Sequence, residues 1–161
     1  MQHTARSVID IRRWTDSARC FAVLDACDLP AVLAQVSSLP PTTAVSLYRE
    51  PAASQYAAFA PYLVQVDAAT FDWITGTLWS EPWGFFCETG ESLETLRTHF
   101  RKFLSVTGPA GEDWLFRFYD PRVLPKYLDT CTSDERAAFR GPVSRFAVTD
   151  PSTYGVLELA F

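Results

Sequence analysis

A run of apolar residues near the start of the chain, from Cys20 to Leu24, is the feature that most constrains the fold. Asp25 closes the run, and no polar side chain interrupts it. A short, uninterrupted run of this kind predicts a β-strand that is buried on both of its faces. Such a strand needs a covering layer on each side, so we expect a sheet packed between helices.

Extended and helical patterns alternate along the rest of the chain. After the first strand, Asp28 is predicted to cap a helix that has Pro30 in its first turn. Further strands are expected at 44–48, 62–66, 83–87, 104–107, 114–119, 143–148 and 154–161. Further helices are expected at 67–78, 93–104, 120–128 and 132–139. Asp67 is predicted to cap the first of these helices, and Thr132 and Glu135 have the spacing of a capping box at the start of the last. Because 104–107 and 114–119 flank a Gly-Pro-Ala-Gly turn, they are predicted to form a hairpin.

This succession predicts an α/β fold, with α+β as the alternative. A chain of 161 residues is the usual size of one domain. We expect a single domain over residues 18–161, with a mixed β-sheet flanked by helices and a C-terminal helical portion. Residues 1–17 are predicted to be an N-terminal arm or a peripheral helix.

Charge and composition narrow the classes of function. The net charge is −5 and the pI is near 5.0, which argues against general nucleic-acid binding. The N-terminal residues lack the pattern of a secretory signal, and no stretch is apolar for the length of a membrane span. We therefore expect a cytoplasmic protein without membrane contact. The four cysteines have no metal-binding spacing and are predicted to be structural thiols, with no metal and no cofactor.

No pattern of catalytic residues is found. The chain has two histidines, and His99 is predicted to lie half exposed on a helix. Nucleophile-elbow, phosphate-loop and zinc-protease motifs are absent. Carboxylate pairs such as Glu81 with Glu88 have no fixed geometry in the sequence, so solvated surface charge is the expected interpretation. We predict no catalytic residue.

The segment Phe116–Arg122 carries the most informative polar side chains. If it is a strand, Phe116 and Phe118 lie on one face while Arg117 and Tyr119 lie on the other. Arg117 and Arg122 can each reach Asp120 or a backbone carbonyl. One interpretation is a buried polar lock, since buried charges need partners. The other is an arginine-lined recognition site that binds carboxylates or carbonyls of a partner.

Two tryptophans form a second candidate site. Trp79 and Trp83 bracket the residues Ser80-Glu81-Pro82. Large aromatic side chains near a loop are either the edge of a core or anchors of an interface, and both interpretations stay open.

The octapeptide Phe-Arg-Phe-Tyr-Asp-Pro-Arg-Val at 116–123 resembles the hallmark of a bacterial family of type VI secretion effector chaperones, also called adaptors. Other segments resemble the family in the same order. They are 21–26, 61–64 followed by Asp67, 83–86, 93–104 and 141–143.

The resemblance implies a binding protein rather than an enzyme. It implies that a cognate toxin effector is held in the cytoplasm and loaded onto the spike-tip protein VgrG. Arg117, Tyr119, Asp120, Arg122, Trp79 and Trp83 are then the candidate partner-binding residues. The alternative function is a small hydrolase or ligand-binding enzyme that uses carboxylates with Arg117 or Arg122.

Overall fold

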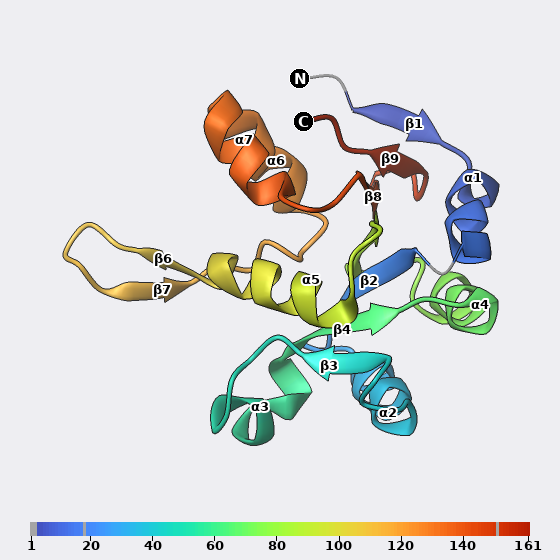
Figure 1. Ribbon diagram of the computed structural model, residues 1–161, viewed down its shortest axis with the longest axis horizontal. Coiled ribbons are helices and arrows are strands. Elements are labelled where there is room, and N and C mark those ends of the chain that lie inside the picture. The colour runs from blue at the N-terminus through green and yellow to red at the C-terminus, as the bar shows by residue number, and fades with distance from the viewer. Residues whose placement is uncertain (1–2, 18, 151) are drawn as a thin grey trace.

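Seven strands of the described chain form one central sheet (Figure 1). The structure is a computed structural model that describes residues 3–17, 19–150 and 152–161. The strand order is β1-β9-β8-β5-β2-β4-β3, and each neighbouring pair is antiparallel. The strands are β1 Thr4–Arg6, β2 Cys20–Asp25, β3 Ala44–Ser46, β4 Pro61–Gln65, β5 Gly84–Glu88, β8 Arg145–Thr149 and β9 Val156–Glu158.

Helices cover both faces of this sheet, which confirms the expected α/β architecture (Figure 1). One face carries α1 Val8–Arg12, α2 Pro30–Ser38 and α4 Ala68–Thr77. The other face carries α5 Leu93–Phe100, α6 Leu124–Thr130 and α7 Ser133–Arg140. The short helix α3 Ala52–Gln55 lies beyond the β3 edge.

The central strand β2 is buried on both faces, as its sequence predicts. Ala22 and Leu24 pack in the core beneath α2 and α4, whereas Phe21 and Val23 pack in the core beneath α5, α6 and α7. Because successive side chains of a strand point to opposite faces, the five apolar residues of β2 contribute to two cores at once.

The core beneath α5, α6 and α7 is largely aromatic. Phe85 on β5 contacts the rings of Phe100 on α5 and Phe146 on β8 at centroid distances of 5.7 and 5.6 Å. Phe139 on α7 completes the group, 5.7 Å from Phe146. Edge-to-face and offset ring pairs each contribute about 0.5–1.5 kcal/mol beyond the buried area.

Side-chain caps fix the starts of α4 and α7, whereas the start of α2 departs from expectation. Asp67 caps α4, and Thr132 with Glu135 forms the predicted capping box of α7. The prediction that Asp28 caps α2 is wrong, because Leu29 holds the cap position without a side-chain hydrogen bond. Asp28 has a φ of 61°, whereas a capping residue needs an extended backbone.

A second, two-stranded sheet projects from the body of the molecule (Figure 1). It is the predicted hairpin, formed by β6 Ser105–Thr107 and β7 Asp113–Leu115. The strand predicted to run to Tyr119 ends four residues earlier, at Leu115.

The first residues of the chain are joined to its last residues. β1 pairs with β9, and Ile11 and Trp14 are buried in the core beneath α2 and α4. A short 3-10 turn at Arg13–Ser17 connects α1 to the following segment. No helix among the described residues is both long and apolar enough to cross a membrane.

Candidate functional site

The octapeptide at 116–123 is a turn rather than a strand, which corrects the expected alternation of its side chains. The Phe116 N–H still donates to the Leu104 carbonyl at 2.8 Å and ends the hairpin. The Asp120 N–H then donates to the Arg117 carbonyl at 3.1 Å, which closes a turn. Helix α6 begins at Leu124 instead of at 120, and the N–H groups of Val123 and Leu124 both donate to the Asp120 carbonyl at 3.0 Å.

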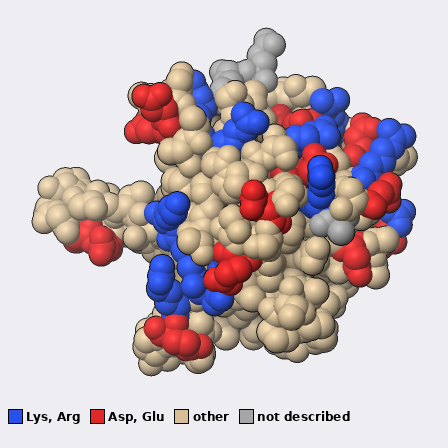
Figure 2. All heavy atoms as spheres, in the orientation of Figure 1, with Lys and Arg blue, Asp and Glu red and all other residues tan. Residues whose placement is uncertain are grey.

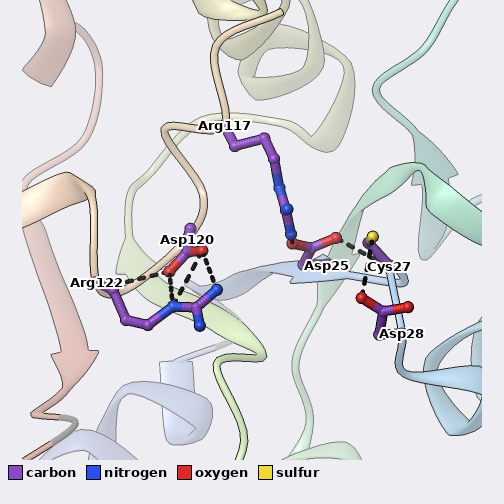
Figure 3. A network of polar contacts seen from close by, with 6 residues as sticks. All are labelled: Asp25, Cys27, Asp28, Arg117, Asp120 and Arg122. Atoms are coloured by element: carbon purple, nitrogen blue, oxygen red, sulfur yellow. Dashed lines mark hydrogen bonds and ion pairs between the residues drawn. The ribbon is translucent and has the colours of Figure 1, made fainter.

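Arg117 forms an ion pair with Asp25, at the end of β2 (Figure 3). The Asp25 side chain is 1% exposed, and the Arg117 side chain is 39% exposed. The second carboxylate oxygen of Asp25 accepts the Cys27 N–H at 3.0 Å. The expectation that Arg117 reaches Asp120 or a carbonyl is therefore wrong: its partner lies 92 residues earlier in the chain.

The electrostatics of this pair are governed by burial. Burial raises the pKa of Asp25 above its usual value, although the hydrogen bond and the charge of Arg117 act in the opposite direction. Burial also lowers the pKa of Arg117, but its hydrogen bond to Asp25 and the negative charge of Asp25 outweigh this effect, and the net shift is upward. The Arg117 Nε atom is itself buried and has no hydrogen-bond partner among the described residues. The pair thus joins the octapeptide to the central strand.

Arg122 pairs with Asp120, as the sequence predicts (Figure 3). Arg122 Nη2 lies 2.6 Å from Asp120 Oδ2, and Nε lies 2.9 Å from Oδ1. Oδ1 also accepts the backbone N–H of Arg122 at 2.9 Å. Burial alone raises the pKa of Asp120, but the bonds from Arg122 outweigh it and lower the pKa below its usual value. The two residues form a local clamp at the start of the turn.

Tyr119 lies in the aromatic core and is close enough to Arg117 and Asp25 to interact with both charges. Its side chain is 1% exposed and its ring is 5.4 Å from that of Phe118. Burial raises the pKa of its hydroxyl, with smaller contributions from Tyr48 and Asp25. The segment containing Tyr48 is fixed by Arg101, which donates to the Tyr48 carbonyl at 2.8 Å.

The two tryptophans differ in burial, although their rings stack at 6.4 Å. Trp83 is fully buried and donates its indole N–H to Thr149 Oγ1 at 3.2 Å. Trp79 is half-buried and donates to the Tyr154 carbonyl at 2.9 Å. Trp83 therefore belongs to the core, and Trp79 lies at its rim.

A hollow of about 160 Å³ brings the two candidate groups together. Trp79, Arg122, Pro121 and the exposed Tyr154 line it. The recorded contacts of Arg122 within the described residues use Nε and Nη2, which leaves Nη1 for another acceptor. The hollow can hold a small apolar group beside a hydrogen-bond acceptor.

His99 is buried at 6% exposure, which corrects the expected half-exposed position. Its Nε2 lies 2.8 Å from the Phe139 carbonyl, which can only accept, so the histidine donates. Burial lowers the pKa of His99. The backbone of Gly141, which has a φ of 51°, lies close to the His99 ring, because a Cβ at this position would lie 2.2 Å from His99 Cε1. His99 is thus a packing residue between α5 and α7.

Sequence reasoning missed Asp25 and Tyr48 as members of the site. Asp25 could have been recognised because it ends a strand that is buried on both faces. Burying a carboxylate there without a partner costs too much free energy, so a paired cation was to be expected. No sequence signal marked Tyr48. Among the described residues, no group of three or more His, Cys, Asp or Glu side chains is placed to hold a metal ion.

Comparison with known families gives one match. A family model described as a domain of unknown function, DUF4123, matches residues 20–138. The chain belongs to the DUF4123 family. No curated protein and no solved structure matches it.

The DUF4123 match contains every candidate site residue. It begins at Cys20, the first residue of β2, and spans the octapeptide together with its distant partner Asp25. Strands β8 and β9 lie beyond the matched residues and extend the same sheet. The Arg117–Asp25 pair is therefore internal to the DUF4123 part of the chain.

Proposed function

We propose that this protein is a non-catalytic chaperone, or adaptor, that binds a cognate type VI secretion toxin effector in the cytoplasm. In this role it helps to load the effector onto the spike protein VgrG. The observation that carries the proposal is the DUF4123 match over residues 20–138, which includes the octapeptide resembling the hallmark of effector chaperones.

The geometry of the polar groups is consistent with binding rather than catalysis. Asp25 and Asp120, the two buried carboxylates of the site, are each paired with an arginine. An acid–base pair needs at least one carboxylate that can reach a substrate. The octapeptide is better explained as a lock that fixes the fold, leaving neighbouring surface residues to contact a partner.

Exposed aromatic residues supply such a surface. Tyr56, Phe59, Trp114 and Tyr154 are each more than half exposed. Tyr and Trp are enriched where partners bind, because one ring offers both apolar area and a polar group.

Co-expression with the toxin and the spike protein encoded beside this chain tests the proposal. We expect the chain to co-elute with the toxin in size-exclusion chromatography, and to recruit the spike protein to that complex. A folded protein of similar size and charge, expressed in place of this chain, is the control. Separate elution of every component, with each shown to be folded by circular dichroism, would exclude the proposed role for that set of partners.

A further inference from the structure

The projecting β6–β7 hairpin carries apolar side chains that nothing in the described chain covers. Val106 and Trp114 are directly opposed across the two strands and are 43% and 51% exposed. Leu115 follows at 58%. A two-stranded hairpin is only marginally stable alone, and a Val–Trp cross-strand pair supports it. Apolar side chains gathered on a projecting element are typical of a binding surface.

The backbone of the hairpin also has open edges. The Gly108 N–H donates to the Glu112 carbonyl, and the Phe116 N–H donates to the Leu104 carbonyl. In this register, Thr107–Asp113 and Ser105–Leu115 are the pairs without hydrogen bonds between the two strands. By the alternation of antiparallel strands, the polar backbone groups of Thr107 and Leu115 point away from the partner strand. Within the described residues they make no backbone bond to another element. An extended peptide can add to such an edge.

Basic side chains gather near the root of the hairpin. Arg97 and Arg101 lie one helical turn apart, and Arg49 follows β3. Arg97 and Arg101 both donate to the Ser46 carbonyl, at 3.3 and 3.4 Å, and Arg101 also donates to the carbonyl of Tyr48, the residue before Arg49. The charges of Arg97 and Arg49 add to burial in lowering the pKa of Arg101. Figure 2 shows blue side chains gathered between the projecting arm and the part of the molecule below it.

This basic cluster is partly free to bind. Arg101 is held in place, since it donates to the carbonyls of Leu47 and Tyr48 at 2.8 Å. Arg49 and the neighbouring Lys102 are exposed, and neither forms an ion pair with another described residue. Arg97 already pairs with Glu94 at 3.4 Å. Within the described residues, the positive charge of the cluster that is not in an ion pair therefore lies on Arg49, Arg101 and Lys102, on a chain whose net charge is −5.

We propose that the hairpin and the basic cluster of Arg49, Arg97, Arg101 and Lys102 form one docking surface for an acidic segment of the effector. The inference rests on the proposed function and adds the chemistry of the partner: apolar side chains for Val106 and Trp114, and carboxylates for the arginines and Lys102. Glu112 and Asp113 near the hairpin turn repel carboxylates and anionic lipids alike. A protein segment can keep its carboxylates at the basic cluster and its apolar side chains at the hairpin, whereas a uniformly anionic membrane surface also meets Glu112 and Asp113.

Charge reversal tests the basic cluster. Lys102→Glu and Arg49→Glu are each expected to weaken effector binding about tenfold, because each replaces an attraction by a repulsion. The control is Lys126→Glu, which reverses the second of the two lysines, exposed on α6, and should leave the affinity unchanged. Affinities are measured by isothermal titration at low ionic strength and at about 0.15 M salt, where wild-type binding should weaken.

Removal of the apolar side chains tests the hairpin. Trp114→Ala is expected to weaken effector binding about tenfold or more, as expected for a tryptophan anchor. Val106→Thr keeps the shape and the strand propensity of the side chain but removes apolar surface, and it should also weaken effector binding. This variant tests the hairpin even if Trp114→Ala disorders it. The control is Ile9→Ala, which changes another exposed apolar residue, on α1. Thermal melts establish that each variant folds.

The outcomes separate this inference from the proposed function. If the wild-type chain binds the effector and all these variants bind equally well, the docking surface is wrong and the chaperone role stands. If the wild-type chain does not bind the effector, the proposed role fails, and the surface is tested with short synthetic peptides of alternating Glu and Val or of alternating Lys and Val. Equal binding of both peptides overturns the inference.

Two further results would assign the surface to a different occupant and overturn the proposal. The first is binding to phosphatidylserine vesicles that Lys102→Glu abolishes while effector affinity is unchanged. The second is self-association of the chain that Trp114→Ala abolishes while effector affinity is unchanged.

Discussion

Two arginine–aspartate pairs involve the octapeptide, and they differ in what they fix. In both, the carboxylate is almost fully buried and the guanidinium is partly exposed. Arg122 and Asp120 are two residues apart, so their pair fixes only the local turn. Arg117 and Asp25 are separated by 92 residues, so their pair joins the octapeptide to the central strand. The first pair shapes a segment, whereas the second positions that segment in the fold.

The largest expected effect is that of Arg117→Ala on stability. This change leaves Asp25 buried with one remaining hydrogen bond, from the Cys27 N–H. We expect a loss of about 3 kcal/mol, near the lower end for a broken buried pair because the Arg117 side chain is 39% exposed. Urea unfolding monitored by circular dichroism measures it. Near-wild-type stability with reduced effector binding would instead identify Arg117 as a recognition residue.

Arg122→Ala is the matched change in the local pair and should cost less. Asp120 keeps the backbone N–H of residue 122, and the Arg122 side chain is 53% exposed. We expect a loss of about 1 kcal/mol. The same urea titration compares the two variants. An equal or larger loss for Arg122→Ala would contradict the distinction between a local and a long-range pair.

Acid should affect the two pairs in opposite directions. The pKa of Asp120 is lowered, so its stabilising contribution is present above the ordinary value of 3.8 and is lost as the pH falls through the folded-state pKa. The pKa of Asp25 is raised by burial, so protonation there favours the folded chain as the pH falls towards 3.8. Asp120→Asn should therefore reduce the acid loss of stability, and Asp25→Asn should not.

Urea midpoints measured from neutral pH to below 3.8 test this difference, with each variant compared with its own value at neutral pH. His99 also makes the protein less stable in acid. Its pKa is lowered from 6.5, so protonation favours the unfolded chain as the pH falls below that value, and this effect is common to both variants. A flattened acid profile for Asp25→Asn, with an unchanged one for Asp120→Asn, would reverse the assignment.

Sequence patterns predicted what depends on neighbours in the chain. The both-faces burial of Cys20–Asp25, the cap at Asp67 and the capping box at Thr132 follow from local spacing, and each is confirmed. The Asp120–Arg122 pair was predictable for the same reason. The antiparallel directions in the sheet were not, since alternating helices and strands leave the strand directions open.

The missed features depend on contacts between distant segments. The sequence around Asp25 does not indicate that Arg117 is its partner, because any basic side chain that the fold brings to that end of β2 could pair with it. The strand predicted over Phe116–Tyr119 has the right alternation, yet its residues turn so that Phe118 and Tyr119 both enter the aromatic core. Burial of those two rings outweighed the local preference for an extended strand.

The pairing of β1 with β9 has a consequence for the order in which this protein folds. The first strand of the described chain completes its hydrogen bonds only with the last strand, Val156–Glu158. Closing so long a loop is slow, because the chain entropy is lost before the contacts form. We expect the sheet around β2, β4 and β5 to form first, with the β1–β9 edge joining last. During synthesis, the N-terminal strand must then wait, unpaired, for nearly the whole chain to emerge.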